Sequence, residues 1–147
     1  MVRITNTIDI DASAAEVYAA LRALDAYPGW LHHSVVYRGT RAAPRSARPA
    51  AAYVDATTVG RMRGELVEDV PGRSLRFHQA KPSGALDAVI VYDIGASPEG
   101  HGTRLTRVGE LTTHGMLRAV QPVLARVAAA ESRRTMTALK RHVEHTG

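Results

Sequence analysis

Apolar and polar residues alternate through most of the chain up to residue 113, which predicts a sheet built from consecutive strands. From Val2 to Ile10 every second residue is apolar, except that Asn6 stands on the apolar side of the pattern. Residues 41–52 carry prolines and no pattern, and they are predicted to form a loop. Six further strands are predicted, at residues 34–41, 53–59, 63–70, 73–79, 85–94 and 102–113.

Two short helices are expected between the first and second strands. Ser13 stands three residues before Glu16, a capping box that predicts a helix over residues 14–24. Asp25 then begins a second short turn, which the Pro-Gly pair at residues 28–29 ends. Strands joined by short turns form antiparallel sheets. We therefore expect an α+β fold in which a seven-stranded antiparallel sheet wraps around a terminal helix.

A long helix is predicted over residues 117–144, where apolar residues recur at helical spacing. Pro122 fits this helix in its first turn and would mark a kink elsewhere. Since one helix cannot fill a curved sheet everywhere, a cavity is expected between the two. The apolar stripe of the helix comprises Leu117, Val120, Leu124, Val127, Ala128, Ala138 and Leu139.

The candidate chemistry begins with Glu131, which lies in the middle of this stripe. A carboxylate there needs a partner or water, so it is predicted to contact a ligand or act as a general acid or base. A structural ion pair and a helix turned toward solvent are the alternatives. Arg107 is predicted to point inward and to bind a carboxylate, polarise a carbonyl or pair with Glu131. Tyr92 and Tyr53 are candidate hydrogen-bond partners of a ligand.

Composition narrows the class of protein. The length of 147 residues favours a single domain over residues 1–147. No cysteine, signal peptide or membrane-spanning run is visible, so a cytoplasmic protein is expected. The formal net charge is +5, but the arginines are spread along the chain without a nucleic-acid motif, so nucleic acid is not an expected partner. The seven histidines form no metal signature, and neither a metal nor a cofactor is expected.

The segment from Ile8 to Trp30 resembles the start of the START-like, or SRPBCC, superfamily, which includes birch-pollen allergens and polyketide cyclase/dehydrase-like proteins. Residues 102–105 at the start of the last strand and the long terminal helix agree with it. The resemblance implies a helix-grip fold around a deep apolar pocket, with Tyr27 and Trp30 at its mouth. Members of this superfamily bind or transform lipids, sterols, plant hormones and polyketides.

The nearest functional precedent that this resemblance implies is the single-domain aromatase/cyclase of polyketide synthesis. Its pocket arginine falls at Asp69, and its two tryptophans fall at Arg63 and Glu65. A tyrosine of that pattern falls near Ser34. Tyr92 and Arg107 stand where the enzymes present large aromatic side chains. These departures count against a cyclase.

Three functions are therefore carried forward. The first is a carrier that binds a small hydrophobic molecule between sheet and helix. The second is a cyclase- or dehydratase-like enzyme with Glu131 and Arg107 as catalytic residues, so catalysis is left open. The third is a protein-interaction module with a vestigial pocket, and the oligomeric state is left open. The predicted ligand-binding residues are Tyr27, Trp30, Leu31, Tyr53, Ile90, Tyr92, Arg107, Leu124, Val127 and Glu131.

Overall fold

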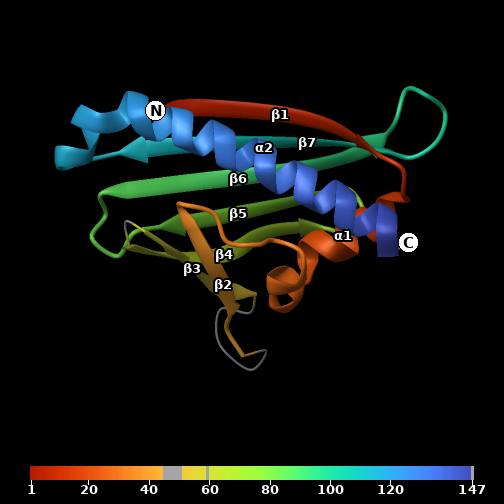
Figure 1. Cartoon of the computed structure of the whole chain (residues 1–147), viewed down its shortest axis with the longest axis horizontal. Coiled ribbons are helices and arrows are strands. Elements are labelled where there is room, and N and C mark those ends of the chain that lie inside the picture. The colour runs from red at the N-terminus through yellow and green to blue at the C-terminus, as the bar shows by residue number, and fades with distance from the viewer. Residues whose placement is uncertain (45–50, 59, 147) are drawn as a thin grey trace.

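A curved sheet of seven antiparallel strands forms the frame of the protein, in a computed structural model that describes residues 1–44, 51–58 and 60–146 (Figure 1). The strands lie in the order β1-β7-β6-β5-β4-β3-β2, so the first and second strands form the two edges. The α+β helix-grip fold is confirmed. The strands are β1 (Val2–Ile10), β2 (Tyr37–Ala42), β3 (Ala52–Thr57), β4 (Gly60–Val70), β5 (Ser74–Ala80), β6 (Leu86–Ala96) and β7 (Thr103–Thr113).

Four helices complete the described chain. The short helix α1 (Ala14–Arg22) and the 3-10 helix η1 (Leu24–Gly29) connect the two edge strands. The 3-10 helix η2 (Gly115–Val120) leads into α2 (Gln121–Thr146), which crosses the sheet diagonally (Figure 1). Ser13 caps α1 as predicted, because its hydroxyl accepts the backbone N–H of Glu16 at 3.1 Å. No helix within the described residues is long and apolar enough to cross a membrane.

The buried face of α2 lies in its C-terminal half and comprises Ser132, Met136, Leu139 and Val143. Asn6, which breaks the alternation of β1, faces this helix and accepts a hydrogen bond from the Ser132 hydroxyl at 2.5 Å. The predicted helix starts as the 3-10 helix η2, to which Leu117 and Val120 belong, and Val120 is exposed there instead of lying on a buried stripe. Pro122 is the second residue of α2, so the helix tolerates it in its first turn.

The second strand begins later than predicted. Residues 34–36 form a turn in which the Ser34 hydroxyl accepts the backbone N–H groups of Val36 at 3.2 Å and Tyr37 at 2.9 Å. Serine hydroxyls favour such local bonds over a strand ladder, which explains the delay. Residues 45–50 of the predicted loop and Val59 at the end of the predicted third strand lie outside the described residues.

Gly64 on β4 allows an aromatic ring to cross the sheet. It is the partner of Tyr53 in the β3–β4 register, and a Cβ atom at residue 64 would lie 2.2 Å from the Tyr53 ring. The ring therefore passes over β4, and its hydroxyl donates to Gln79 Oε1 on β5 at 2.8 Å. The missing side chain at residue 64 thus sets the position of Tyr53 on the concave face.

A Gly64→Ala substitution is expected to lower the free energy of unfolding by about 1–3 kcal/mol, because the new methyl group displaces the Tyr53 ring. Urea unfolding measures this change. Gly95→Ala on β6 is the matched control, since the nearest heavy atom lies 4.0 Å from its new Cβ atom. Equal stability of the two variants would show that Tyr53 does not depend on Gly64.

Candidate functional site

A cavity of about 240 Å³ lies between the concave face of the sheet and the N-terminal half of α2. Its walls are mostly apolar, and Leu124, Val127 and Ala128 line it from the helix. None of these three helix residues belongs to the buried face that packs on the sheet. The space exists because α2 contacts the sheet closely only beyond this segment.

Aromatic rings form the floor of the cavity across the middle of the sheet. Tyr53 on β3 meets Phe77 on β5 edge to face, with ring centroids 6.0 Å apart. Phe77 meets Tyr92 on β6 in the same way at 6.1 Å. Such edge-to-face pairs are favourable beyond the area that they bury. We call these three residues the aromatic floor.

The guanidinium group of Arg107, on β7, lies next to the last ring of the aromatic floor. Arg107 is the partner of Tyr92 in the β6–β7 register, and its Nε donates to the Tyr92 hydroxyl at 3.1 Å. The guanidinium carbon lies 5.7 Å from the centroid of the Tyr92 ring. Among the described residues, no protein acceptor contacts its Nη1 or Nη2 atom. These donors remain available inside a mostly apolar cavity, and the inward direction predicted for Arg107 agrees with its place in the lining.

A carboxyl group lies at the opposite end of the floor. Asp55 is two residues beyond Tyr53 on β3 and lines the same cavity. Its Oδ1 accepts the Thr40 hydroxyl at 2.6 Å, and the Thr40 and Tyr37 hydroxyls lie 2.5 Å apart. Within the described chain, no donor contacts Oδ2. The prediction from sequence missed Asp55, although its alternation with Tyr53 places the two on one strand face.

The surroundings of Asp55 change its ionisation. Burial raises the pKa of this carboxyl to about 6, while the Thr40 hydrogen bond and the positive charge of Arg107 act in the opposite direction. The tyrosines around it, Tyr27, Tyr37 and Tyr53, have pKa values raised chiefly by their own burial. Asp55 therefore exchanges a proton near neutral pH, as a general acid or base requires.

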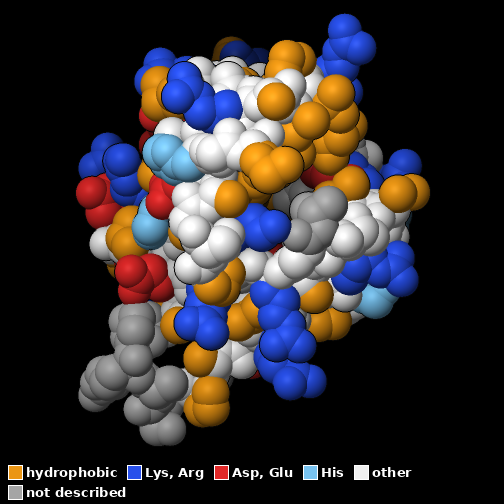
Figure 2. Space-filling view, turned by 90° about the vertical axis from the view of Figure 1, so that its left-hand side faces the viewer, with side chains coloured by type: hydrophobic (Ala, Val, Ile, Leu, Met, Phe, Trp, Pro, Cys, Tyr) orange, Lys and Arg blue, Asp and Glu red, His pale blue; other side chains and the backbone are white. Residues whose placement is uncertain are grey.

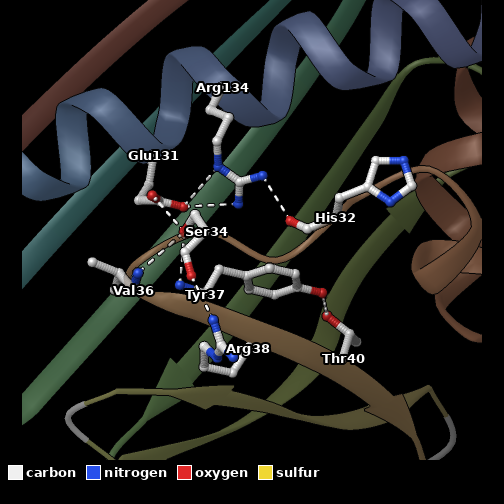
Figure 3. A network of polar contacts seen from close by, with 8 residues as sticks. All are labelled: His32, Ser34, Val36, Tyr37, Arg38, Thr40, Glu131 and Arg134. Atoms are coloured by element: carbon white, nitrogen blue, oxygen red, sulfur yellow. Dashed lines mark hydrogen bonds and ion pairs between the residues drawn. The ribbon is translucent and has the colours of Figure 1, made fainter.

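Glu131 is not part of the aromatic floor. It forms a hydrogen-bonded network with Ser34 and Arg134, which we call the clamp (Figure 3). Its Oε1 accepts the Ser34 hydroxyl at 2.9 Å, and its Oε2 accepts Arg134 Nη2 at 2.9 Å. Arg134 also donates to the backbone carbonyl of His32 at 2.8 Å. These bonds tie α2 to the segment before β2. The carboxylate is half-buried and forms its ion pair with Arg134, so among the alternatives left open for Glu131 the structural ion pair is present, with Arg134 rather than Arg107 as the partner.

All of the predicted ligand-binding residues line the cavity except Trp30. Trp30 is buried beside it, with its ring 4.9 Å from that of Tyr27 and 5.8 Å from that of His142 on α2. Its indole N–H has no partner among the described residues. The end of η1 turns Trp30 toward the C-terminal half of α2, so its ring packs beside the cavity and is absent from the lining.

The end of the molecule that carries η2 is partly apolar at its surface. Figure 2 shows hydrophobic side chains gathered there beside a hollow, with Lys and Arg side chains around them. Met116, Val120 and Val123 are the large exposed apolar residues of η2 and the start of α2. The next residue, Leu124, lines the cavity, so this surface adjoins the cavity wall.

Comparison with known proteins identifies the family. Residues 1–144 match the family described as polyketide cyclase / dehydrase and lipid transport. The chain belongs to this family. No curated protein matches the chain. The family name covers both an enzymatic and a transport activity, so membership alone does not choose between the carrier and enzyme alternatives.

Solved structures of low sequence identity share the fold of this cyclase and lipid-transport family member. A START superfamily protein from Mycobacterium smegmatis is 13% identical, with a TM-score of 0.73 and 99% of each chain covered. A conserved protein from Geobacillus kaustophilus is 14% identical, with a TM-score of 0.73, and the match covers 99% of this chain and 97% of that chain. The di-domain ARO/CYC StfQ of steffimycin biosynthesis is 14% identical, with a TM-score of 0.74 over 99% of this chain and 52% of that chain.

Three of the residues that depart from the aromatase/cyclase pattern, Asp69, Arg63 and Glu65, do not line the cavity, whereas Arg107 does. Asp69, at the position expected for the arginine, accepts the Tyr18 hydroxyl at 2.5 Å and Arg22 Nε at 3.1 Å. Arg63 and Glu65, at the positions of the tryptophans, are absent from the lining. The charged groups at the two ends of the aromatic floor come instead from β3 (Asp55) and β7 (Arg107). Among the described residues, no three His, Asp or Glu side chains gather as metal ligands would.

The ionisation of Asp55 predicts a pH-dependent stability. In the folded protein the Asp55 carboxyl stays protonated up to about pH 6, whereas in the unfolded chain it loses its proton near pH 4. The contribution of Asp55 to the free energy of unfolding therefore falls as the pH rises between about 4 and about 6. Asp55→Asn is expected to stabilise the protein by up to about 3 kcal/mol at pH 7.5 and by almost nothing at pH 4.

Chemical denaturation at the two pH values measures this difference. Asp93→Asn is the matched control, because Asp93 is an exposed residue on the other face of β6 and is expected to give no pH-dependent change. A stability gain for Asp55→Asn that is the same at pH 4 and pH 7.5 would contradict the assigned ionisation.

Proposed function

We propose that the protein binds a small, mostly apolar molecule in the cavity between the sheet and α2. The observation that carries this proposal is the cavity of about 240 Å³, whose apolar walls enclose a few unpartnered polar groups. Cavities with this combination are typical of ligand sites. Its volume exceeds the about 150 Å³ of an apolar cavity that holds benzene, which indicates a ligand of one or two rings or similar size.

The size of the ligand sets the strength of apolar binding. A ligand of one or two rings buries roughly 200 Å² of apolar surface, which contributes about 5 kcal/mol at about 25 cal/mol per Å². The loss of translational and rotational freedom costs about 4 kcal/mol or more. Apolar burial therefore supports only weak binding, and the polar groups at the two ends of the aromatic floor supply both affinity and orientation.

Filling the cavity is expected to abolish ligand binding. Val127→Trp places a large ring inside the cavity and should weaken the binding of indole or naphthalene at least tenfold, measured by ligand-observed NMR or calorimetry. Val123→Trp is the matched control one helical turn earlier, because Val123 is 61% exposed and does not line the cavity. Equal weakening by both variants, or no binding to the wild type, would reject the proposal.

A second candidate function is acid–base catalysis of the cyclase or dehydratase kind. The observation that favours it is Asp55, a cavity carboxyl whose pKa burial raises to about 6, with the Arg107 donors across the floor. Glu131, the acid or base first expected, is a weaker candidate because both of its oxygens accept hydrogen bonds in the clamp. Loss of turnover in Asp55→Asn with ligand affinity retained would support the enzyme, whereas loss in Glu131→Gln alone would support the original assignment.

A further inference from the structure

We propose that the ligand is a small hydroxylated carboxylic acid, held with its carboxylate on Arg107, its apolar body on the aromatic floor and its hydroxyl on Asp55. This inference rests on the proposed function, since it names the chemical class that the same cavity accepts. It differs from a purely apolar ligand by requiring two polar groups at opposite ends.

The carboxylate of the proposed ligand is inferred from the Arg107 guanidinium, which has no carboxylate partner among the described residues. Among these residues its one hydrogen-bond partner is the Tyr92 hydroxyl, which accepts from Nε. Its Nη1 lies 3.6 Å from the place where a Cβ atom of Gly109 would stand, so the guanidinium extends along the strand over a residue without a side chain. A guanidinium fork binds a carboxylate through two parallel hydrogen bonds. A carboxylate here would neutralise a charge that is otherwise costly in an apolar cavity.

The Tyr92 hydroxyl strengthens this end of the site. It accepts from Arg107 Nε, and its own proton has no acceptor among the described side chains and backbone groups. The hydroxyl can therefore donate to the same ligand carboxylate, and the register of β6 and β7 holds Tyr92 and Arg107 opposite each other. Two neighbouring residues thus present free donors at this end of the cavity.

The hydroxyl of the proposed ligand is inferred from the second carboxyl oxygen of Asp55. The Thr40 hydroxyl donates to Asp55 Oδ1 and itself contacts the Tyr37 hydroxyl, so the orientation of the Asp55 carboxyl is fixed. Oδ2 meets no donor in the described part of the chain. A ligand hydroxyl satisfies this oxygen whether the carboxyl is ionised or neutral, because a hydroxyl both donates and accepts. A second carboxylate at this end would instead repel Asp55.

The aromatic floor sets the ligand length. Its three rings follow one another at centroid distances of 6.0 and 6.1 Å, and Asp55 and Arg107 lie on β3 and β7 at its two ends. A single ring with a short acid side chain spans such a floor and stacks on it. A ligand of this size agrees with a cavity of about 240 Å³.

Four probes test the proposal with the full chain at pH 7.5: para-hydroxyphenylpropanoate, phenylpropanoate and the methyl ester of each. Calorimetry is expected to show that the hydroxy acid binds at least tenfold more tightly than its ester and than the acid without the hydroxyl. Arg107→Gln is expected to remove the preference for acid over ester, and Asp55→Ala the preference for the hydroxyl.

Arg76→Gln is the matched control, since Arg76 is exposed on β5 and does not line the cavity; it is expected to leave both preferences unchanged. If a cavity variant fails to fold, the four wild-type affinities alone decide. Equal binding of all four probes would overturn the ligand class and leave the proposed function standing. Binding of none of them, the two esters included, would overturn both.

Discussion

The site depends on one geometric constraint: a single straight helix cannot stay in contact with a curved sheet along its whole length. The C-terminal half of α2 packs against the sheet through Ser132, Met136, Leu139 and Val143, and the Ser132–Asn6 hydrogen bond fixes it to β1. Its N-terminal half then stands away from the central strands. The apolar side chains there line a hollow instead of filling it, so the cavity is a consequence of the packing.

The same constraint explains why the polar groups of the cavity remain unpaired. Asp55 and Arg107 project from β3 and β7, which three other strands separate, so the aromatic floor lies between them. Glu131 could have neutralised Arg107, but Ser34 and Arg134 hold its carboxylate in the clamp over the segment before β2. A carboxyl and a guanidinium are thus kept apart inside one hollow, an arrangement that costs stability and suits a ligand with two polar ends.

The order of strands and helices could be predicted because alternation, the capping box and the turn residues are local signals. The inward direction of Arg107 followed from the same alternation. Asp55 could have been found by applying it to β3, but its bond to Thr40 depends on a register shift in β2 that no local pattern shows. The sequence left the partner of Glu131 open, and the structure places Arg134, three residues later on the same helix, in that role. The direction of Trp30 could not be predicted, because the direction of a residue at the end of a 3-10 helix depends on packing.

The proposed ligand occupies the hollow between the N-terminal half of α2 and the aromatic floor. The most direct test of this location is to record intermolecular NOEs between bound indole and the methyl groups of the protein. A ligand in the hollow is expected to give NOEs to Leu124, Val127 and Ile90, which line it from both sides. NOEs confined to the exposed methyl groups of Met116 and Val123, or none at all, would contradict it.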